Sequence, residues 1–330
     1  MAIHLIATGG TIASLPDPES GAVSPAIGAE ALVTSVPGLA ALDVRTEEVA
    51  HVNGYNVTPD TMLAVAERAS AALERDDVTG VVVTHGTDTV EETAFLCDRV
   101  LASDKPVAFA AAMRNGGEIA ADGPRNLLGA ALLAADPQAR RLGVVLVLND
   151  EFHAARWARK QDTHLPSAFS SPDHGPLGRV DPGSVRVLVR PAPVPAVARP
   201  AALDRPVPVI KTYSGMDEGL IEAIIDATGA AGLVLEGTGL GNVPGAAERG
   251  IRAALDRGLP VVVATSVPAG GTRAVYGGPG GGATLAALGV AQADALSAAK
   301  ARLLLMLTLA GGASSADALD AFAGIVRALA

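Results

Sequence analysis

AIHLIATGGT, residues 2–11, joins a short apolar run to a turn built only from threonine and glycine. A second segment, GVVVTHGTDT at residues 80–89, has the same design, because a continuous apolar run is followed by glycine and hydroxyl side chains. Continuous apolar runs of this length are typical of strands buried on both faces of a parallel sheet. We therefore expect two buried parallel strands, each followed by a polar loop.

Helical patterns separate the apolar runs along most of the chain. Residues 58–76, TPDTMLAVAERASAALERD, begin with a threonine and a proline, which suit an N-cap and the first helical position. A further helix is expected at 90–102, and further strands at 106–112 and 143–149. Buried strands that alternate with helices predict an α/β fold with a mainly parallel sheet flanked by helices.

A proline-dense segment interrupts this alternation. Residues 190–208, RPAPVPAVARPAALDRPVP, show almost no periodicity and are predicted to form an interdomain linker. The α/β pattern resumes after it. The sequence therefore predicts two α/β domains: a larger N-terminal catalytic domain at 1–189 with a mainly parallel sheet, and a smaller C-terminal parallel-sheet domain at 209–330.

The composition limits the classes of partner. The chain has 330 residues and a net charge of −10, and an acidic surface repels phosphate backbones, so no nucleic acid is expected as a partner. The apolar stretch LLLMLTLAGGA at 303–313 is too short to span a bilayer, so no membrane is expected either. A strand pattern starts within two residues of Met1, which predicts a cytoplasmic protein without a signal peptide. The single cysteine, Cys97, lies in an apolar helical pattern and is expected to be a core residue.

The loops after the two opening strands carry groups suited to acyl transfer. If the strands are parallel neighbours, Thr11 and Thr87 lie at the same edge of the sheet, where α/β proteins bind ligands. Glycines beside them leave backbone N–H groups open to an oxyanion. A threonine hydroxyl needs a base, and Asp88 with Lys160, one of only four lysines, are the candidates.

Each motif taken alone has an ordinary structural alternative. TGGT at 8–11 is also a common turn composition, and His85 suits a hydrogen bond to the backbone as well as it suits chemistry. No HExxH pattern or clustered cysteine and histidine ligands occur, so no catalytic metal is expected.

ATGGTIAS at 7–14, together with THGTDTVEETA at 84–94, resembles the bacterial-type L-asparaginase family. AAMRNGGEIAADGPRNL at 111–127, FSSPDHGPLG at 169–178 and LSAAKARLLLML at 296–307 are similar to further segments of that family, so the resemblance extends over essentially the whole chain. It implies hydrolysis of L-asparagine, a small amide, to L-aspartate and ammonia without a cofactor.

The resemblance also implies roles for individual residues. Thr11 would be the nucleophile that is acylated, and water would then hydrolyse the aspartyl ester with help from Thr87, Asp88 and Lys160. Asp88 would also hold the α-amino group of the substrate. The implied substrate-binding positions are Gly10, Gly54, Tyr55, Gly86, Ala112 and Asn242. Members of this family pair protomers face to face, which implies a homodimer or homotetramer in which Asn242 reaches into a neighbouring site.

The sequence departs from the family pattern at three places. Residues 14–28 correspond to the mobile lid, yet Ala22 stands where the family has a tyrosine. The loop at 51–60 offers Gly54 and Tyr55 where a glycine-serine pair binds the substrate carboxylate. Residues 265–278 hold Tyr276 but not the acid that a neighbouring subunit usually provides. As a hypothesis, Tyr55 or Tyr276 supplies the missing phenol; the alternative is that both rings only pack.

These departures keep other functions open. The same chemistry on L-glutamine, a D-amino acid amide or a larger asparaginyl compound is one alternative. A protein that binds asparagine on the same scaffold without hydrolysing it is a second alternative, although the retained threonines, Asp88 and Lys160 argue against it.

Overall fold

The computed structural model describes residues 1–329 of the chain. Contacts within the chain divide it into two compact units, residues 1–197 and the residues from 198 onward. The division falls inside the 190–208 segment that the sequence marks as a linker.

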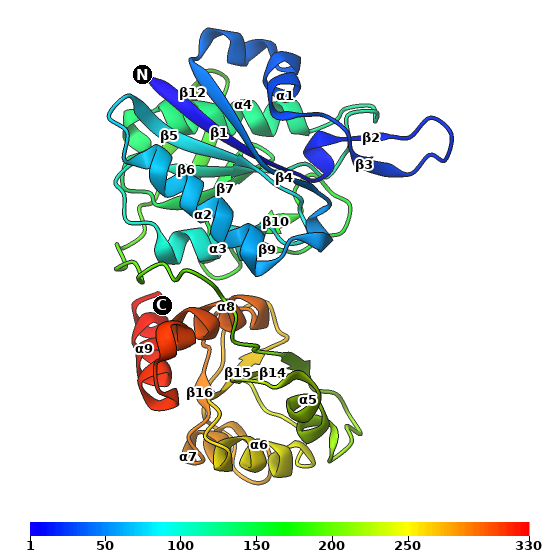
Figure 1. Ribbon diagram of the computed structural model, residues 1–330, viewed down its shortest axis with the longest axis vertical. Coiled ribbons are helices and arrows are strands. Elements are labelled where there is room, and N and C mark those ends of the chain that lie inside the picture. The colour runs from blue at the N-terminus through cyan, green and yellow to red at the C-terminus, as the bar shows by residue number, and fades with distance from the viewer. Residues whose placement is uncertain (330) are drawn as a thin grey trace. The chain divides into compact units, whose positions relative to one another are not determined.

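The first unit is built on an eight-stranded sheet with the order β12-β11-β8-β7-β6-β5-β1-β4 (Figure 1). Its strands are β1 (Ala2–Gly9), β4 (Val44–Val52), β5 (Val78–Thr84), β6 (Val107–Ala110), β7 (Val144–Leu148), β8 (Glu151–Ala154), β11 (Gly178–Asp181) and β12 (Ser184–Val187). The five strands from β4 to β7 are parallel, and the remaining three are added antiparallel at one edge. The predicted mainly parallel sheet is confirmed.

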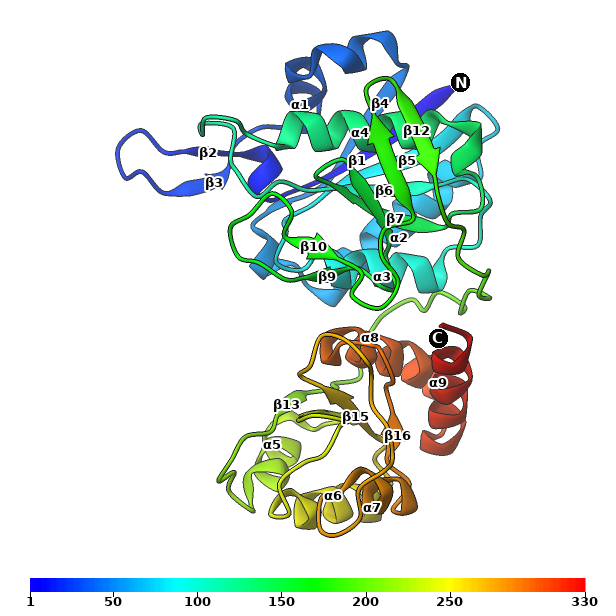
Figure 2. The ribbon, with the colours of Figure 1, turned by 180° about the vertical axis from the view of Figure 1, so that it is seen from behind.

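Helices cover both faces of this sheet. Two of them, α2 (Pro59–Leu73) and α3 (Val90–Val100), lie on one face, and α1 (Ala29–Ser35) and α4 (Gly123–Ala135) lie on the other (Figures 1 and 2). The hydroxyl of Thr58 accepts a hydrogen bond from the Thr61 N–H, as expected for the cap of α2.

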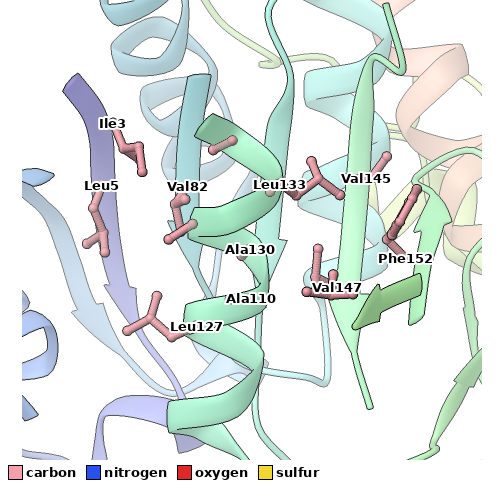
Figure 3. Packing of buried hydrophobic residues seen from close by; sticks show 14 of the residues in the cluster. Ile3, Leu5, Val82, Ala110, Leu127, Ala130, Leu133, Val145, Val147 and Phe152 are labelled. Carbon is pink, nitrogen blue, oxygen red and sulfur yellow. The ribbon is translucent and has the colours of Figure 1, made fainter. Parts of the chain in front are cut away.

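One layer of the first unit's core lies between α4 and the sheet. Leu127 and Leu133 of α4 pack over Leu5 and Val82, which come from β1 and β5 (Figure 3). Cys97 on α3 is fully buried, as predicted. The parallel strands therefore sit in a rigid layer, and the loops at their carboxyl ends are held by it.

Two short antiparallel pairs complete the first unit: β2 (Ser14–Pro16) with β3 (Val23–Pro25), and β9 (Arg159–Lys160) with β10 (Phe169–Ser170). The first pair makes a hairpin of the 14–28 segment, which the sequence showed only as a loop rich in glycine, proline and serine. Both Ala26 and Ile27, which follow β3, donate their N–H groups to the carbonyl of Ala13. The end of the hairpin is therefore bound to the turn that contains Thr11.

The second unit contains a four-stranded parallel sheet with the order β13-β14-β15-β16. Its elements are β13 (Val209–Lys211), β14 (Leu233–Gly237), β15 (Val261–Thr265), β16 (Ala291–Gln292), α5 (Leu220–Thr228), α6 (Ala247–Asp256), α7 (Gly282–Ala287), α8 (Ala298–Leu309) and α9 (Ser315–Leu329). A smaller C-terminal parallel sheet is therefore confirmed. Across residues 1–329 no helix has both the length and the apolar character needed to cross a membrane.

Candidate active site

The loops after β1 and β5 are in direct backbone contact. The two strands are parallel neighbours, with Ala7 opposite Thr84, and the Thr8 hydroxyl donates a 2.8 Å hydrogen bond to the Thr84 carbonyl. A Cβ atom placed on Gly10 would lie only 2.3 Å from the Cα atom of Gly86. Glycine is therefore required where the two loops cross, and the turns that carry the two threonines lie at one edge of the sheet.

Thr11 begins a short 3-10 turn, Thr11–Ala13, whose start is held from both sides. The N–H of Gly10 donates to the Val52 carbonyl at 3.0 Å. The carbonyl of Gly10 accepts from the Ala13 N–H and from the buried Ser14 hydroxyl, the latter at 2.8 Å. The peptide that precedes Thr11 is thereby immobilised, and the Thr11 side chain remains partly accessible.

Thr87, Asp88 and Lys160 meet although Lys160 comes from a distant strand. The Lys160 ammonium donates to the Thr87 hydroxyl at 3.0 Å and to the Asp88 carboxylate at 2.8 Å. The lysine side chain is 22% exposed and that of Asp88 is 53% exposed, so the pair faces solvent from one side only. Since the ammonium occupies a lone pair of the Thr87 oxygen, the hydroxyl hydrogen of Thr87 is left to donate elsewhere.

Glu91, which the sequence analysis did not identify, holds Lys160 in place. The backbone N–H of Lys160 donates to the Glu91 carboxylate at 2.9 Å, which ties β9 to the first turn of α3. The sequence does show two acidic residues, Glu91 and Glu92, shortly after Thr89. Acidic residues are common in the first turn of a helix, so their presence alone does not predict a contact with Lys160.

His85 has a structural partner on each ring nitrogen. Nδ1 lies 2.9 Å from the Gly86 carbonyl and Nε2 lies 2.9 Å from the Thr93 hydroxyl. Burial lowers the pKa of His85 to about 4, so the ring is neutral near pH 7. If the Thr93 hydroxyl donates to Nε2, Nδ1 carries the proton and donates to Gly86. Of the two readings left open by the sequence, this geometry favours the hydrogen bond to the backbone.

Of the predicted substrate-binding positions in the first unit, Gly54 and Ala112 are buried and Tyr55 is exposed. Gly54 lies against Gly86 and its carbonyl accepts a 2.7 Å hydrogen bond from the Thr89 hydroxyl. Ala112 is fully buried, two residues beyond β6. Tyr55 is 67% exposed, and its hydroxyl accepts from the Asn53 amide at 2.9 Å.

Asn242 and Tyr276 belong to the second unit. The side-chain oxygen of Asn242 accepts a 3.0 Å hydrogen bond from the Gly282 N–H, and its carbonyl accepts one from the Thr238 N–H. Tyr276 is 57% exposed. Within its own unit, Asn242 therefore stabilises a tight loop, whereas the Tyr276 ring faces outward.

The arrangement of the first unit is suited to acyl transfer. Within residues 1–329, no three histidine, cysteine or carboxylate side chains are placed as the ligands of a metal would be. The site combines a partly accessible Thr11 hydroxyl with a hydroxyl–carboxylate–ammonium cluster. The Gly10 N–H, which the sequence predicted to be open to an oxyanion, is instead bonded to the Val52 carbonyl.

Comparisons with known proteins agree with this chemistry. The family model described as "Asparaginase, N-terminal" matches residues 2–193, and "Glutaminase/Asparaginase C-terminal domain" matches residues 206–322. The chain is 39% identical over 320 residues to the "Probable L-asparaginase" of Deinococcus radiodurans, covering 96% of this chain and 95% of that one. It is 34% identical to "L-asparaginase 2" of Bacillus subtilis, covering 93% and 82%. A solved structure, "Probable Cytoplasmic L-asparaginase from Campylobacter jejuni", superposes with a TM-score of 0.87 at 31% identity and covers 97% and 98% of the two chains.

Proposed function

Because this chain belongs to the asparaginase family, we propose that it is an amidohydrolase that converts L-asparagine to L-aspartate and ammonia. The observation that carries the proposal is the Lys160 ammonium, which lies 3.0 Å from the Thr87 hydroxyl and 2.8 Å from the Asp88 carboxylate. Thr87 and Asp88 lie in the same loop as Gly86, which is in close backbone contact with Gly10, the residue that precedes Thr11.

In the proposed first step, the Thr11 oxygen forms a bond to the side-chain amide carbon of the substrate. The N–H group of Thr87 stabilises the negative charge on the former carbonyl oxygen, because the Gly10 N–H already donates to the Val52 carbonyl. The Thr11 proton passes to the leaving nitrogen through the Thr87–Asp88–Lys160 cluster, the C–N bond breaks, and ammonia departs. An aspartyl ester on Thr11 remains.

In the second step, water attacks the ester carbon and the bond to the Thr11 oxygen breaks. The water loses one proton to the cluster, which returns a proton to Thr11, so aspartate is released and the hydroxyl is regenerated. Throughout both steps, the Asp88 carboxylate holds the substrate α-ammonium group. No cofactor enters either step, because amide hydrolysis requires only a nucleophile, proton transfer and oxyanion stabilisation.

The proposal extends to the assembly and the location of the chain. We propose a homodimer or homotetramer in which Asn242 completes the site of a neighbouring chain, and a cytoplasmic location, which the name of the Campylobacter jejuni structure supports.

A second candidate is the same reaction on another amide. The description of the C-terminal family model includes glutaminase, and in the 51–60 loop Tyr55 stands where the family has the serine that binds the substrate carboxylate. A Cβ atom on Gly54 would lie 3.1 Å from the Gly86 backbone, so the glycine of the pair is retained for lack of space, whereas the Tyr55 ring that replaces the serine is 67% exposed. L-Glutamine and D-amino acid amides therefore belong in the substrate panel.

Ammonia release from L-asparagine, D-asparagine and L-glutamine tests the proposal. We expect L-asparagine to give the highest kcat/KM, and Thr11→Ala to lower kcat by at least about 10³-fold. Thr34→Ala removes an exposed hydroxyl on α1 and serves as the control. If calorimetry detects asparagine binding but neither protein releases ammonia, the chain is a binding protein; if Thr11→Ala is as active as wild type, the nucleophile is wrong.

A further inference from the structure

A large cavity lies at the opposite edge of the first sheet from the Thr11 and Thr87 loops. Its volume is about 830 Å³, and its walls come from the end of α3, the residues before β7 and the proline-rich strap, which we define as residues 190–197. This volume is typical of a site for a small organic ligand. The catalytic proposal does not use the cavity.

The strap is bound to the rest of the first unit by arginines. The Arg190 guanidinium donates to the carbonyls of Gln138 and Arg140, and Arg156 donates to the carbonyl of Ala192 at 3.0 Å. The N–H of Val197 donates to the Arg99 carbonyl. The part of the predicted linker nearest the first unit is therefore a fixed wall rather than a free connection.

The lining of the cavity carries an excess of positive charge. Four arginines face two aspartates there, Arg140, Arg141, Arg156 and Arg190 against Asp98 and Asp104. The chain as a whole has a net charge of −10, so this concentration of arginine is unusual for its surface. A concave surface with an excess of one sign of charge attracts ions of the opposite sign and raises their local concentration.

Two of the arginines at the mouth have donors to spare. The Arg140 guanidinium makes no side-chain hydrogen bond or ion pair with any residue from 1 to 329, and Arg141 lies 3.8 Å from the Asp104 carboxylate, beyond hydrogen-bond distance. Arg141 is held in the left-handed backbone region at φ 66° by a bond from its N–H to the Asp104 carbonyl. Non-glycine residues adopt this conformation infrequently, and it fixes the direction in which the Arg141 side chain leaves the loop.

A buried carboxylate lies between two buried guanidinium groups at one wall of the cavity. The buried Asp98 carboxylate accepts from Arg99 at 2.5 Å and lies 3.3 Å from the guanidinium of Arg156. Two buried guanidinium groups thus share one buried carboxylate. The Nε and Nη1 atoms of Arg99 are buried without a hydrogen-bond partner among the described residues.

We propose that this cavity binds a small organic phosphate. A guanidinium fork matches phosphate oxygens with paired hydrogen bonds, and a phosphate monoester carries about −1.5 to −2 charges near pH 7, which matches the excess of two arginines. A single carboxylate would neutralise only part of that excess. The apolar walls, made by Leu101, Leu142, Val194 and the prolines of the strap, would hold the organic part of the ligand.

Calorimetric titration with AMP, without magnesium, tests the site. We expect one AMP per chain at about 50 mM NaCl and clearly weaker binding at about 300 mM, because salt screens exposed charges. Adenosine, which lacks the phosphate, should not bind detectably. Absence of AMP binding at low salt overturns the proposal, as does citrate binding in its place, which would assign the cavity to carboxylates.

Two variants place the binding in this cavity. The double variant Arg140→Gln/Arg141→Gln should weaken AMP binding at least about tenfold, whereas Arg179→Gln/Arg186→Gln, an equal change in charge on β11 and β12, should change it less than about twofold. Ala102→Trp fills the cavity from an exposed position without a charge change and should also weaken binding. If AMP binds equally well to the Arg140→Gln/Arg141→Gln and Ala102→Trp proteins, the assigned location is wrong. Ammonia release by these variants should match wild type, so failure here is distinguishable from failure of the proposed hydrolysis.

Discussion

At the scale of single residues, His85 links the stability of the site to pH. The pKa of its ring is about 4 in the folded chain, because burial disfavours the charged form, against 6.5 for the free side chain. Above pH 6.5 the ring is neutral in both states. As the pH falls from 6.5 towards 4, the unfolded chain takes up the proton and the folded chain does not, so stability is lost over that range.

We predict that the free energy of unfolding of wild type falls by roughly 2–3 kcal/mol between about pH 7.5 and 4.5 through His85 alone. Other groups titrate in the same range, including His153, whose pKa burial also lowers. The measurement is therefore the difference between wild type and His85→Gln in urea unfolding at both pH values. An identical pH dependence of the two proteins would show that His85 is not held neutral.

Lys160 is the residue on which proton movement depends in the proposed reaction. We predict that Lys160→Met lowers kcat by about 10²–10⁴-fold, the usual contribution of a positioned proton-transfer group, with a much smaller change in KM. Lys211→Met is the matched control, because Lys211 is exposed and pairs only loosely with Glu236. Steady-state ammonia release decides the matter: equal losses in both variants would remove Lys160 from the proposed mechanism.

The sequence predicted which residues form the candidate site better than it predicted the contacts that hold them. Thr11, Thr87 and Asp88 stand in motifs after apolar runs, and Lys160 stands out because lysine is rare in this chain. The supporting contacts of Ser14 and Glu91 could not be predicted, because each depends on which backbone atom folding brings near an ordinary polar side chain.

At the scale of elements, the crossing of the β1 and β5 loops sets the site's geometry. We predict that Gly10→Ala destabilises the chain by at least about 2 kcal/mol more than Gly21→Ala. Both glycines have positive φ, but a Cβ on Gly10 meets the Gly86 backbone, whereas one on Gly21 meets open space at the hairpin tip. Urea unfolding measures the difference.

The same pair of variants should differ in activity. Displacing a nucleophile by about 1 Å typically costs on the order of 10²-fold in rate, so Gly10→Ala should lose ammonia release to that extent while Gly21→Ala keeps most of it. Comparable stability and activity in the two proteins would show that the loops can separate without consequence.

Strands that are buried and apolar could be predicted from the sequence, and strands at the exposed edges of the unit could not. The strands at 2–7 and 80–86 appear in the structure within two residues at each end, as β1 and β5. The strand β4, VRTEEVAHV, was not predicted, because as an edge strand it is only half buried and needs no apolar run. The hairpin at 14–25 was missed for a related reason, since its short strands are largely exposed and depend on contacts with Ala13.

At the scale of the whole molecule, the proposed sharing of sites between chains makes a quantitative prediction. Thr11→Ala and Asn242→Ala should each lose most activity, and equal mixing after dissociation and reassembly should restore about a quarter of the wild-type rate. Random pairing makes about half of the dimers mixed, and each mixed dimer has one intact site.

Ammonia release measures this recovery, and light scattering confirms that both variants assemble like wild type. Because the Asn242 side chain also holds the Gly282 N–H, its variant must be shown to fold before mixing. Two variants that assemble normally but regain nothing on mixing would indicate that each site lies within one chain.

The position of β1 between β4 and β5 has a consequence for protein synthesis. β1 leaves the ribosome with neither neighbour made, since β4 begins at Val44 and β5 at Val78. At about 5–20 residues per second, the nascent strand waits for ~4–15 s until β5 is translated. During that interval its apolar side chains are a natural target for chaperones, and the turn bearing the nucleophile is translated first yet takes its final shape only after the chain has grown past the second threonine.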